Sequence, residues 1–204
     1  MDGRLAQLTT NPNTTNNHKE GLIMSNEVSA SLEDGMVKTV FVPAIKDVKA
    51  PTVAELTGEG VLDMSMWLTG DGFQATHGQN MIDDDREGSA EVGQIPGQET
   101  WTDTLLRVVD NINRVDDSNK AIDNTLVETL TRGKTGYFVR RRGLPSEQEF
   151  TAGQKVSVLP VTIGIKTPVA HAVNQRQLSQ ITFSVSPGAQ DETATVAAGS
   201  GGGA

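Results

Sequence analysis

The sequence predicts a mainly β protein, an antiparallel β-sandwich or barrel with one flanking α-helix. Apolar residues alternate with polar ones over several short segments, which is the period of a strand with one buried face. Only 36% of the 204 residues are hydrophobic and 21 are glycines, a composition that favours strands and turns over helices. A single segment has helical spacing, and we expect strands both before and after it.

The clearest strand lies near the C-terminal end of the body. Ile181, Phe183 and Val185 alternate there with Thr182 and Ser184. This alternation predicts one face in the core and one face in water.

Residues 155–165 predict a longer strand. Its apolar face is expected to carry the following residues: Ser157, Leu159, Val161, Ile163 and Ile165. Pro160 interrupts the segment, and because proline has no backbone N–H it predicts a ladder edge or a bulge at that point.

Residues 61–68 and 102–109 alternate less regularly and are also predicted as strands. Trp67 and Trp101 flank the polar stretch 70–100, which has too few apolar residues to form a core of its own. We interpret this stretch as a long excursion and both tryptophans as core anchors; the alternative is that one of them contacts a neighbouring subunit.

One helix is predicted between the strands. Asp117 or Ser118 is a suitable N-cap, and Gly133 stands where a glycine commonly ends a helix. Ile122, Leu126 and Leu130 fall at i, i+4 and i+8 and predict a buried stripe that covers one opening of the sheet.

The chain divides into three predicted parts. Residues 1–36 are a polar N-terminal arm, residues 37–188 are the β domain, and residues 189–204 are a flexible glycine-rich tail. There are no cysteines, so neither disulfides nor thiolate metal sites support the fold. No apolar run is long enough to cross a membrane, and no signal peptide precedes the body, so we expect a protein made in a cytoplasm without a membrane partner.

Charge is distributed unevenly around a net value of -9. Residues 55–103 hold eleven acidic side chains against one basic, and residues 133–168 hold six basic against two acidic. A chain this acidic is a poor candidate for holding DNA, which requires clustered lysines and arginines against the phosphates.

The sequence gives little support for a catalytic or metal-binding site. The three histidines, His18, His77 and His171, belong to no recognised catalytic or zinc motif, so we expect neither a catalytic site nor a cofactor. The acidic run Asp83, Asp84, Asp85 and Glu87 has the oxygen ligands of a cation site. Consecutive residues of an extended segment point to opposite faces, however, so a solvated face or an arginine-binding interface is favoured.

Arg140, Arg141 and Arg142 are consecutive in a predicted strand. Arg140 and Arg142 then share a face with Phe138, and Arg141 lies on the opposite face with Val139. Aromatic content is only 4%, which argues against a single-strand-binding platform. We expect these arginines to contact another subunit and hypothesise that they pair there with the acids at 83–87; DNA contact is the weaker alternative.

Several segments, taken in order, resemble a known family. They are PTVAEL, LTGDGF, the acidic DDDR, YFVRRRG, AGQKV and LPVTIGI. In this order they resemble the major tail protein, or tail tube protein, of long-tailed non-contractile bacteriophages, particularly those of actinobacteria. The resemblance spans residues 36–188.

The resemblance implies a structural virion protein whose copies form stacked rings, hexameric in the family, around a hollow conduit for DNA ejection. It implies synthesis in the host cytoplasm and a place in the phage tail. The expected partners are other copies of the chain, the tape measure and other tail proteins, and genomic DNA in transit. In such tubes an extended hairpin packs on the adjacent subunit, and residues 70–100 are the candidate; the N-terminal arm is expected to cross a subunit or ring boundary.

Three alternatives remain open at the level of sequence. A monomeric immunoglobulin-like binding or decoration module would show strands every 8–12 residues, which the unbroken polar stretch 70–100 counts against. An enzyme on a β scaffold would need converging titratable groups. A tail terminator or head protein of a phage would share much of the same pattern.

Overall fold

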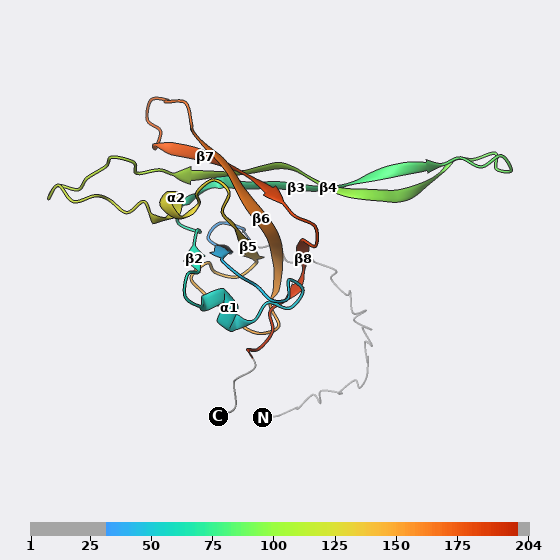
Figure 1. The fold of residues 1–204 in the computed structure, drawn as a ribbon, viewed down its shortest axis with the longest axis horizontal. Coiled ribbons are helices and arrows are strands. Elements are labelled where there is room, and N and C mark those ends of the chain that lie inside the picture. Colours follow the sequence, from blue (N-terminus) through green and yellow to red (C-terminus); the bar gives the residue numbers. More distant parts are fainter. Residues whose placement is uncertain (1–31, 200–204) are drawn as a thin grey trace, which may run out of the picture. The chain divides into compact units, whose positions relative to one another are not determined.

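A computed structural model describes residues 32–199, which belong to one compact unit. Eight antiparallel strands form one sheet in the order β2-β1-β5-β6-β7-β4-β3, with β8 paired to β6 (Figure 1). The strands are β1 Val37–Val42, β2 Leu62–Asp63, β3 Leu68–Asp84, β4 Gly93–Val109, β5 Thr135–Arg142, β6 Lys155–Pro168, β7 Leu178–Val185 and β8 Gln190–Thr195. The predicted mainly β, antiparallel class is confirmed, as a single curled sheet.

Two short helices accompany the sheet, α1 Val53–Thr57 and α2 Thr125–Thr129, where the sequence predicted one. The described helices are all too short and too polar to cross a bilayer. The α1 turn carries a signal that sequence reasoning missed: Thr52 caps the Glu55 N–H while the Glu55 carboxylate accepts from the Thr52 N–H. This reciprocal capping box is readable from a threonine three residues before a glutamate.

The sheet buries both of its faces where β1, β5 and β6 meet. On one face Phe41, Phe73, Phe138 and Phe183 form an aromatic cluster with centroid separations of 5.1–6.0 Å. On the other face Val40, Val139 and their neighbours form a second core with α1. Strand residues alternate between these two cores, which is why a one-residue slip in register would be so costly.

A β-bulge in β6 changes which side chains face the core. Between the pairs Ile163↔Phe183 and Lys166↔Ile181, β6 contains one more residue than β7. The Thr182 hydroxyl accepts from the Ile165 N–H within the bulge. Ile163 is therefore buried whereas Ile165 is 52% exposed, so the expectation that Ile165 continues the buried face is wrong.

Pro160 lies where the β6 ladder passes from one partner to the next. Val161 pairs with β7 and Val158 pairs with β8, and the Pro160 carbonyl accepts from the Ser186 N–H in the connection between them. The missing N–H therefore falls at a break in the ladder, as the sequence predicted.

The predicted C-terminal boundary at residue 188 is wrong. Strand β8 lies beyond it, with Ala194 and Val196 fully buried in the second core. Ala197 also donates to the Pro51 carbonyl and accepts from the Val53 N–H. The apolar residues of this segment are few and small, so its composition resembled that of a linker. Residues 200–204 and residues 1–31 of the predicted N-terminal arm lie outside the described part.

The N-cap of the helix is Asn124, six or seven residues later than the predicted Ser118 or Asp117, and α2 spans a single turn. The Asp116 carboxylate accepts from the backbone N–H groups of Ser118 and Lys120, each at 2.9 Å, and closes a tight turn instead of a helix. Asn119 supplies the left-handed backbone of that turn, with φ 61°. Ile122 is consequently outside the helix and only half-buried.

The apolar part of the predicted stripe is nevertheless correct. Leu126 is 0% exposed and Leu130 is 3% exposed, and both pack in the aromatic core. Gly133 lies further on, in the turn before β5, where it has a φ of +84° and donates to the Ile163 carbonyl.

Replacing Leu126 by alanine is expected to lower the free energy of unfolding by about 2–5 kcal/mol, because the surrounding core cannot close around the cavity. Urea denaturation of the unassembled subunit measures this loss. The control is Ile165→Ala, at a side chain that is 52% exposed, which should change stability little. Equal stability of the two variants would contradict the placement of α2 against the core.

Candidate inter-subunit surfaces

Strands β3 and β4 form a long hairpin whose outer half has no support from the rest of the sheet. Strand β4 pairs with β7 only over Leu105–Val109. Beyond the pair His77↔Trp101 the two strands pair only with each other, among the residues described. We call residues 78–100 the arm; Figure 1 shows it reaching beyond the other strands. The predicted excursion at 70–100 is this hairpin.

The arm exposes large apolar side chains. Met81, Ile82, Val92 and Ile95 are 55%, 56%, 61% and 49% exposed, and Ile82 and Ile95 face each other across the two strands. A two-stranded ribbon is marginally stable in water by itself, and exposed apolar side chains clustered on one element mark an interaction surface. The arm is therefore suited to packing against another molecule.

The base of the arm is fixed to the body. The imidazole of His77 stacks on the Trp101 indole with centroids 4.2 Å apart, and it also approaches the Glu99 and Asp191 carboxylates at 3.4 and 3.6 Å. Trp67 and Trp101 both pack partly buried against the aromatic core, in agreement with their interpretation as anchors. The arm consequently leaves the body in a defined direction.

The predicted acidic site residues lie at the tip of the arm. Asp83, Asp85 and Glu87 are exposed, and Asp84 forms two contacts of 2.9 Å with Arg86. Over residues 32–199 the structure contains no cluster of three or more metal-ligating side chains. The tip thus presents carboxylates next to the apolar side chains of the arm.

The three arginines of β5 have three different environments. Arg141 is 1% exposed; its guanidinium donates to the carbonyls of Pro145, Gln148 and Glu149 and lies over the Phe150 ring at 5.4 Å. It joins the 143–149 loop to the second core. The expectation that Arg141 contacts another subunit is therefore wrong, because the alternation of β5 turns it into the interior.

Arg142 is engaged within the chain. It bonds the Glu192 carboxylate, and this hydrogen bond raises the pKa of the Arg142 guanidinium and lowers the pKa of Glu192. Arg140 lies over the Phe73 ring at 4.9 Å, and burial lowers the pKa of its guanidinium. Within the described residues no carboxylate comes within ion-pair distance of Arg140.

One chain does not bring the arginines and the tip acids together, since β5 lies in the body and the acids lie on the arm. Their pairing between copies stays a prediction for Arg140 and Arg142 only. Reversing all three charges would unfold the subunit through Arg141 and would not test an interface.

The sheet ends on a long open edge. Within residues 32–199, strand β3 is seventeen residues long and pairs only with β4. Exposed strand edges invite pairing with another chain, and native proteins shorten, charge or cover them. This edge is long, and no other described strand pairs with it, which is a feature of a subunit that assembles through its sheet.

At the far end of β4 a buried carboxylate organises three elements. Asp110 is 2% exposed and accepts from Ser179 Oγ at 2.6 Å, Lys166 Nζ at 2.9 Å, and Asn124 Nδ2 and the Ile112 N–H at 3.1 Å each. Burial alone would raise the pKa of Asp110, but these hydrogen bonds outweigh it and hold the pKa below its ordinary value.

Because the pKa of Asp110 is lower in the folded chain than in the unfolded chain, its contribution to stability is complete above the ordinary aspartate pKa of about 4. That contribution is lost as pH falls from there through the lowered folded pKa. Asp110→Asn is expected to cost about 1–3 kcal/mol at pH 7, because the new amide opposes the Lys166 and Ser179 donors.

Urea denaturation of wild type and Asp110→Asn at a series of pH values checks this expectation. The difference in unfolding free energy should shrink steadily below pH 4. Asp117→Asn, at an exposed carboxylate that accepts no hydrogen bond among the described residues, is the control. A difference that stays constant over the acid range would contradict the linkage.

A protein-family model described as a phage tail tube protein matches residues 24–198, which include all eight strands. No curated protein matches the chain. Among solved structures, a chain of the complex titled "Cryo-EM structure of the anti-feeding prophage (AFP) baseplate, 6-fold symmetrised" gives a TM-score of 0.44 at 8% identity. That alignment covers 78% of this chain and 94% of the other chain.

Proposed function

The chain belongs to the phage tail tube protein family, and from this premise we propose that it is the major tail tube subunit. Its copies form closed rings, six to a ring by the resemblance to the major tail proteins, and the rings stack into a hollow conduit through which DNA leaves the particle. The role is geometric and requires neither a catalytic residue nor a cofactor.

The unsupported arm carries this proposal. Its distal strands expose Ile82, Ile95 and Met81 in a ribbon that no other element of residues 32–199 covers. A neighbouring copy supplies the missing contact surface, and repetition of one contact around a ring buries every arm.

The open edge of β3 supports the same proposal. A ring in which β3 pairs with a strand of the next copy removes an edge that a monomer would expose along seventeen residues. A closed barrel of this kind has no remaining sheet edge, which protects the assembly from further association.

The electrostatics suit a conduit. With a net charge of -9, a ring repels phosphates, whereas a basic lumen would hold DNA by many contacts and slow its exit. DNA therefore makes only transient contact with the tube. The further partners are the tape measure and other tail proteins. The subunit is made in the host cytoplasm and incorporated into the virion.

Negative-stain electron microscopy of the purified full chain tests the proposal. We expect hollow tubes or stacked rings of uniform diameter. Single rings that never stack would favour a tail terminator. A chain that stays monomeric at high concentration would favour an immunoglobulin-like decoration module and overturn the proposal.

A further inference from the structure

Two adjoining hollows lie at the end of the sheet where β4 finishes. One is bordered by α2 and the other by the start of β7, and Ile112 and Lys166 line both of them. Their walls are largely apolar and include Val127, Leu130 and Val169. We call this paired hollow the Ile112 groove. Ile112 itself is 48% exposed, so a large apolar side chain stands open in the groove.

The groove is rigid because the buried Asp110 carboxylate joins its walls. The Asp110 carboxylate accepts from the Ile112 N–H, from Lys166 on β6 and from Ser179 on β7. It thereby fixes three walls of the groove relative to one another. A preformed surface loses little conformational freedom when it binds a partner.

The rim of the groove carries positive charge. Arg132 lines one hollow and Arg176 lines the other, both exposed, and neither forms an ion pair with a described carboxylate. Lys166 neutralises Asp110, which leaves Glu128 as the other acid of the lining. The groove is thus apolar inside and predominantly cationic at its edge.

The arm tip combines apolar and acidic side chains, which complement the apolar wall and cationic rim of the groove. It presents Ile82 and Ile95 beside the exposed carboxylates Asp83, Asp85 and Glu87. Apolar contact with the groove wall supplies affinity, and pairing of the tip acids with the rim arginines selects the partner and its orientation.

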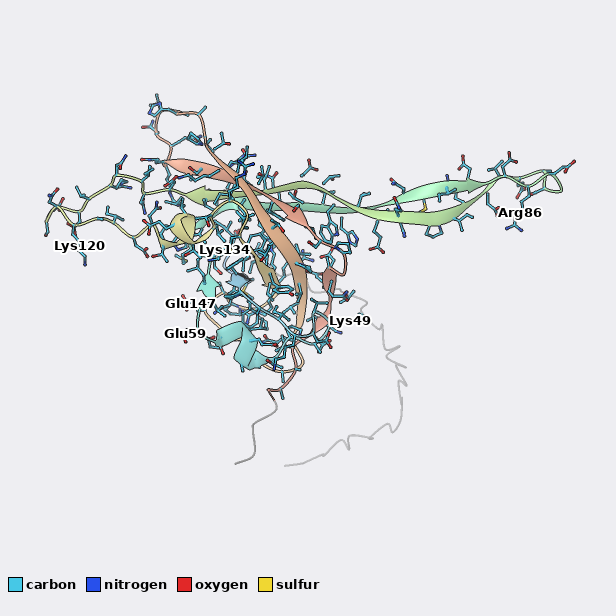
Figure 2. All side chains as sticks on the ribbon, viewed as in Figure 1. Lys49, Glu59, Arg86, Lys120, Lys134 and Glu147 are labelled. Carbon is cyan, nitrogen blue, oxygen red and sulfur yellow. The ribbon has the colours of Figure 1, made fainter. Side chains whose placement is uncertain are left out.

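The two surfaces lie at opposite ends of one strand. Strand β4 begins at the arm tip with Gly93 and ends at Val109, next to the groove, a span of roughly 55 Å for seventeen extended residues. Figure 2 labels Arg86 at the arm tip and, at the opposite end of the hairpin, Lys120 in the loop that follows β4. An arm therefore cannot reach its own groove. The tip of one copy and the groove of the next can meet head to tail, a pairing that repeats indefinitely or closes into a ring.

We propose that the Ile112 groove receives the arm tip of a second copy of this chain, with the rim arginines Arg132 and Arg176 opposite the tip carboxylates. This inference rests on the proposed function and names the contact through which the subunits associate. Arg140 and Arg142, the remaining candidates from the sequence, line different hollows that also carry Glu33, Asp34, Asp191 and Glu192, so an acidic tip is repelled there.

Cross-linking tests the contact directly, because the chain has no cysteine of its own. The full chain carrying Ile95→Cys and Ile112→Cys is treated with a short bismaleimide and run on a denaturing gel. A head-to-tail contact gives a ladder of covalent oligomers. Either single variant gives at most dimers, because each chain then has one reactive site.

The matched control is Ile95→Cys with Met66→Cys, since Met66 is 88% exposed and lines the hollow beside Arg140. No ladder is expected for this pair. A ladder with Met66 and none with Ile112, or no ladder in either pair while tubes form, overturns the inference and leaves the proposed function standing. If wild type forms no tube, the proposed function fails, and the gel still decides the contact.

A mixing experiment gives a second reading. Ile112→Glu disables the groove, and Ile82→Glu with Ile95→Glu disables the arm, so each variant by itself should stay monomeric. One intact arm and one intact groove remain in an equimolar mixture, which should yield one-to-one heterodimers by native mass spectrometry. A mixture that stays monomeric, although both variants melt like wild type, overturns the inference.

Discussion

Arg141→Met is expected to lower the free energy of unfolding by about 3–5 kcal/mol, a large part of the stability of a domain of this size. The guanidinium donates to three loop carbonyls, at 2.9 Å to Gln148, 3.3 Å to Glu149 and 2.5 Å to Pro145. Methionine fills similar space but donates nothing, so these acceptors lose their partner in a place where the arginine is 1% exposed. The 143–149 loop then loses its attachment to the core.

Arg142→Met is the matched control, one position further along the same strand. Arg142 is about half exposed and bonds Glu192 at the surface, where an ion pair is worth at most about 1 kcal/mol. Denaturation should be measured under conditions in which the subunit is unassembled, because assembly adds stability by mass action. If the two variants lose equal stability, Arg141 does not hold the loop as the structure indicates.

The sequence predicted the strands of the body better than it predicted which of their faces are buried. Alternation placed Arg141 opposite Arg140 and Arg142, and the structure confirms that division of faces. Alternation could not show that both faces of β5 are buried, since that depends on α1 and the 143–149 loop folding over the second face. A charged triplet consequently resembled an interface although its central member is interior.

The errors at α2 and β8 have local causes. The Asp116 carboxylate accepts from the backbone N–H groups of Ser118 and Lys120 and so competes with helix formation. The apolar spacing of Ile122, Leu126 and Leu130 does not reveal this competition. In β8 and the residue that follows it, the buried apolar side chains are Ala194 and Val196, too few and too small to stand out from a linker. The arm was predictable because its length and polarity exceed what any internal loop requires.

The Ile112 groove could not be predicted from the sequence. Its lining comes from the end of β4, from α2, from the end of β6 and from the loop before β7, which are far apart along the chain. Only the register of the sheet brings them together. Asp110 was the available signal, as an acid directly following an apolar strand, but nothing local shows that Ser179 and Lys166 will reach it.

Removal of the arm is expected to abolish assembly and leave the subunit folded. Gly78 and Thr100 are paired across the hairpin, so residues 79–99 can be replaced by Asn-Gly, which closes two antiparallel strands with a two-residue turn. The deleted residues bury little in their own chain: Met81, Ile82 and Ile95 are each about half exposed, and the body keeps the His77–Trp101 stack. The melting temperature of the unassembled subunit should therefore change little, while electron microscopy shows no tubes at concentrations where wild type forms them.

A variant that keeps the arm but carries Ile82→Thr and Ile95→Thr separates the apolar contact from the carboxylates. It retains every charge, but its association loses buried apolar area. Its assembly should therefore need a higher protein concentration than wild type. Normal tubes from the arm-deleted chain would show that the subunits associate through the sheet edge alone and that the exposed side chains of the arm serve another purpose.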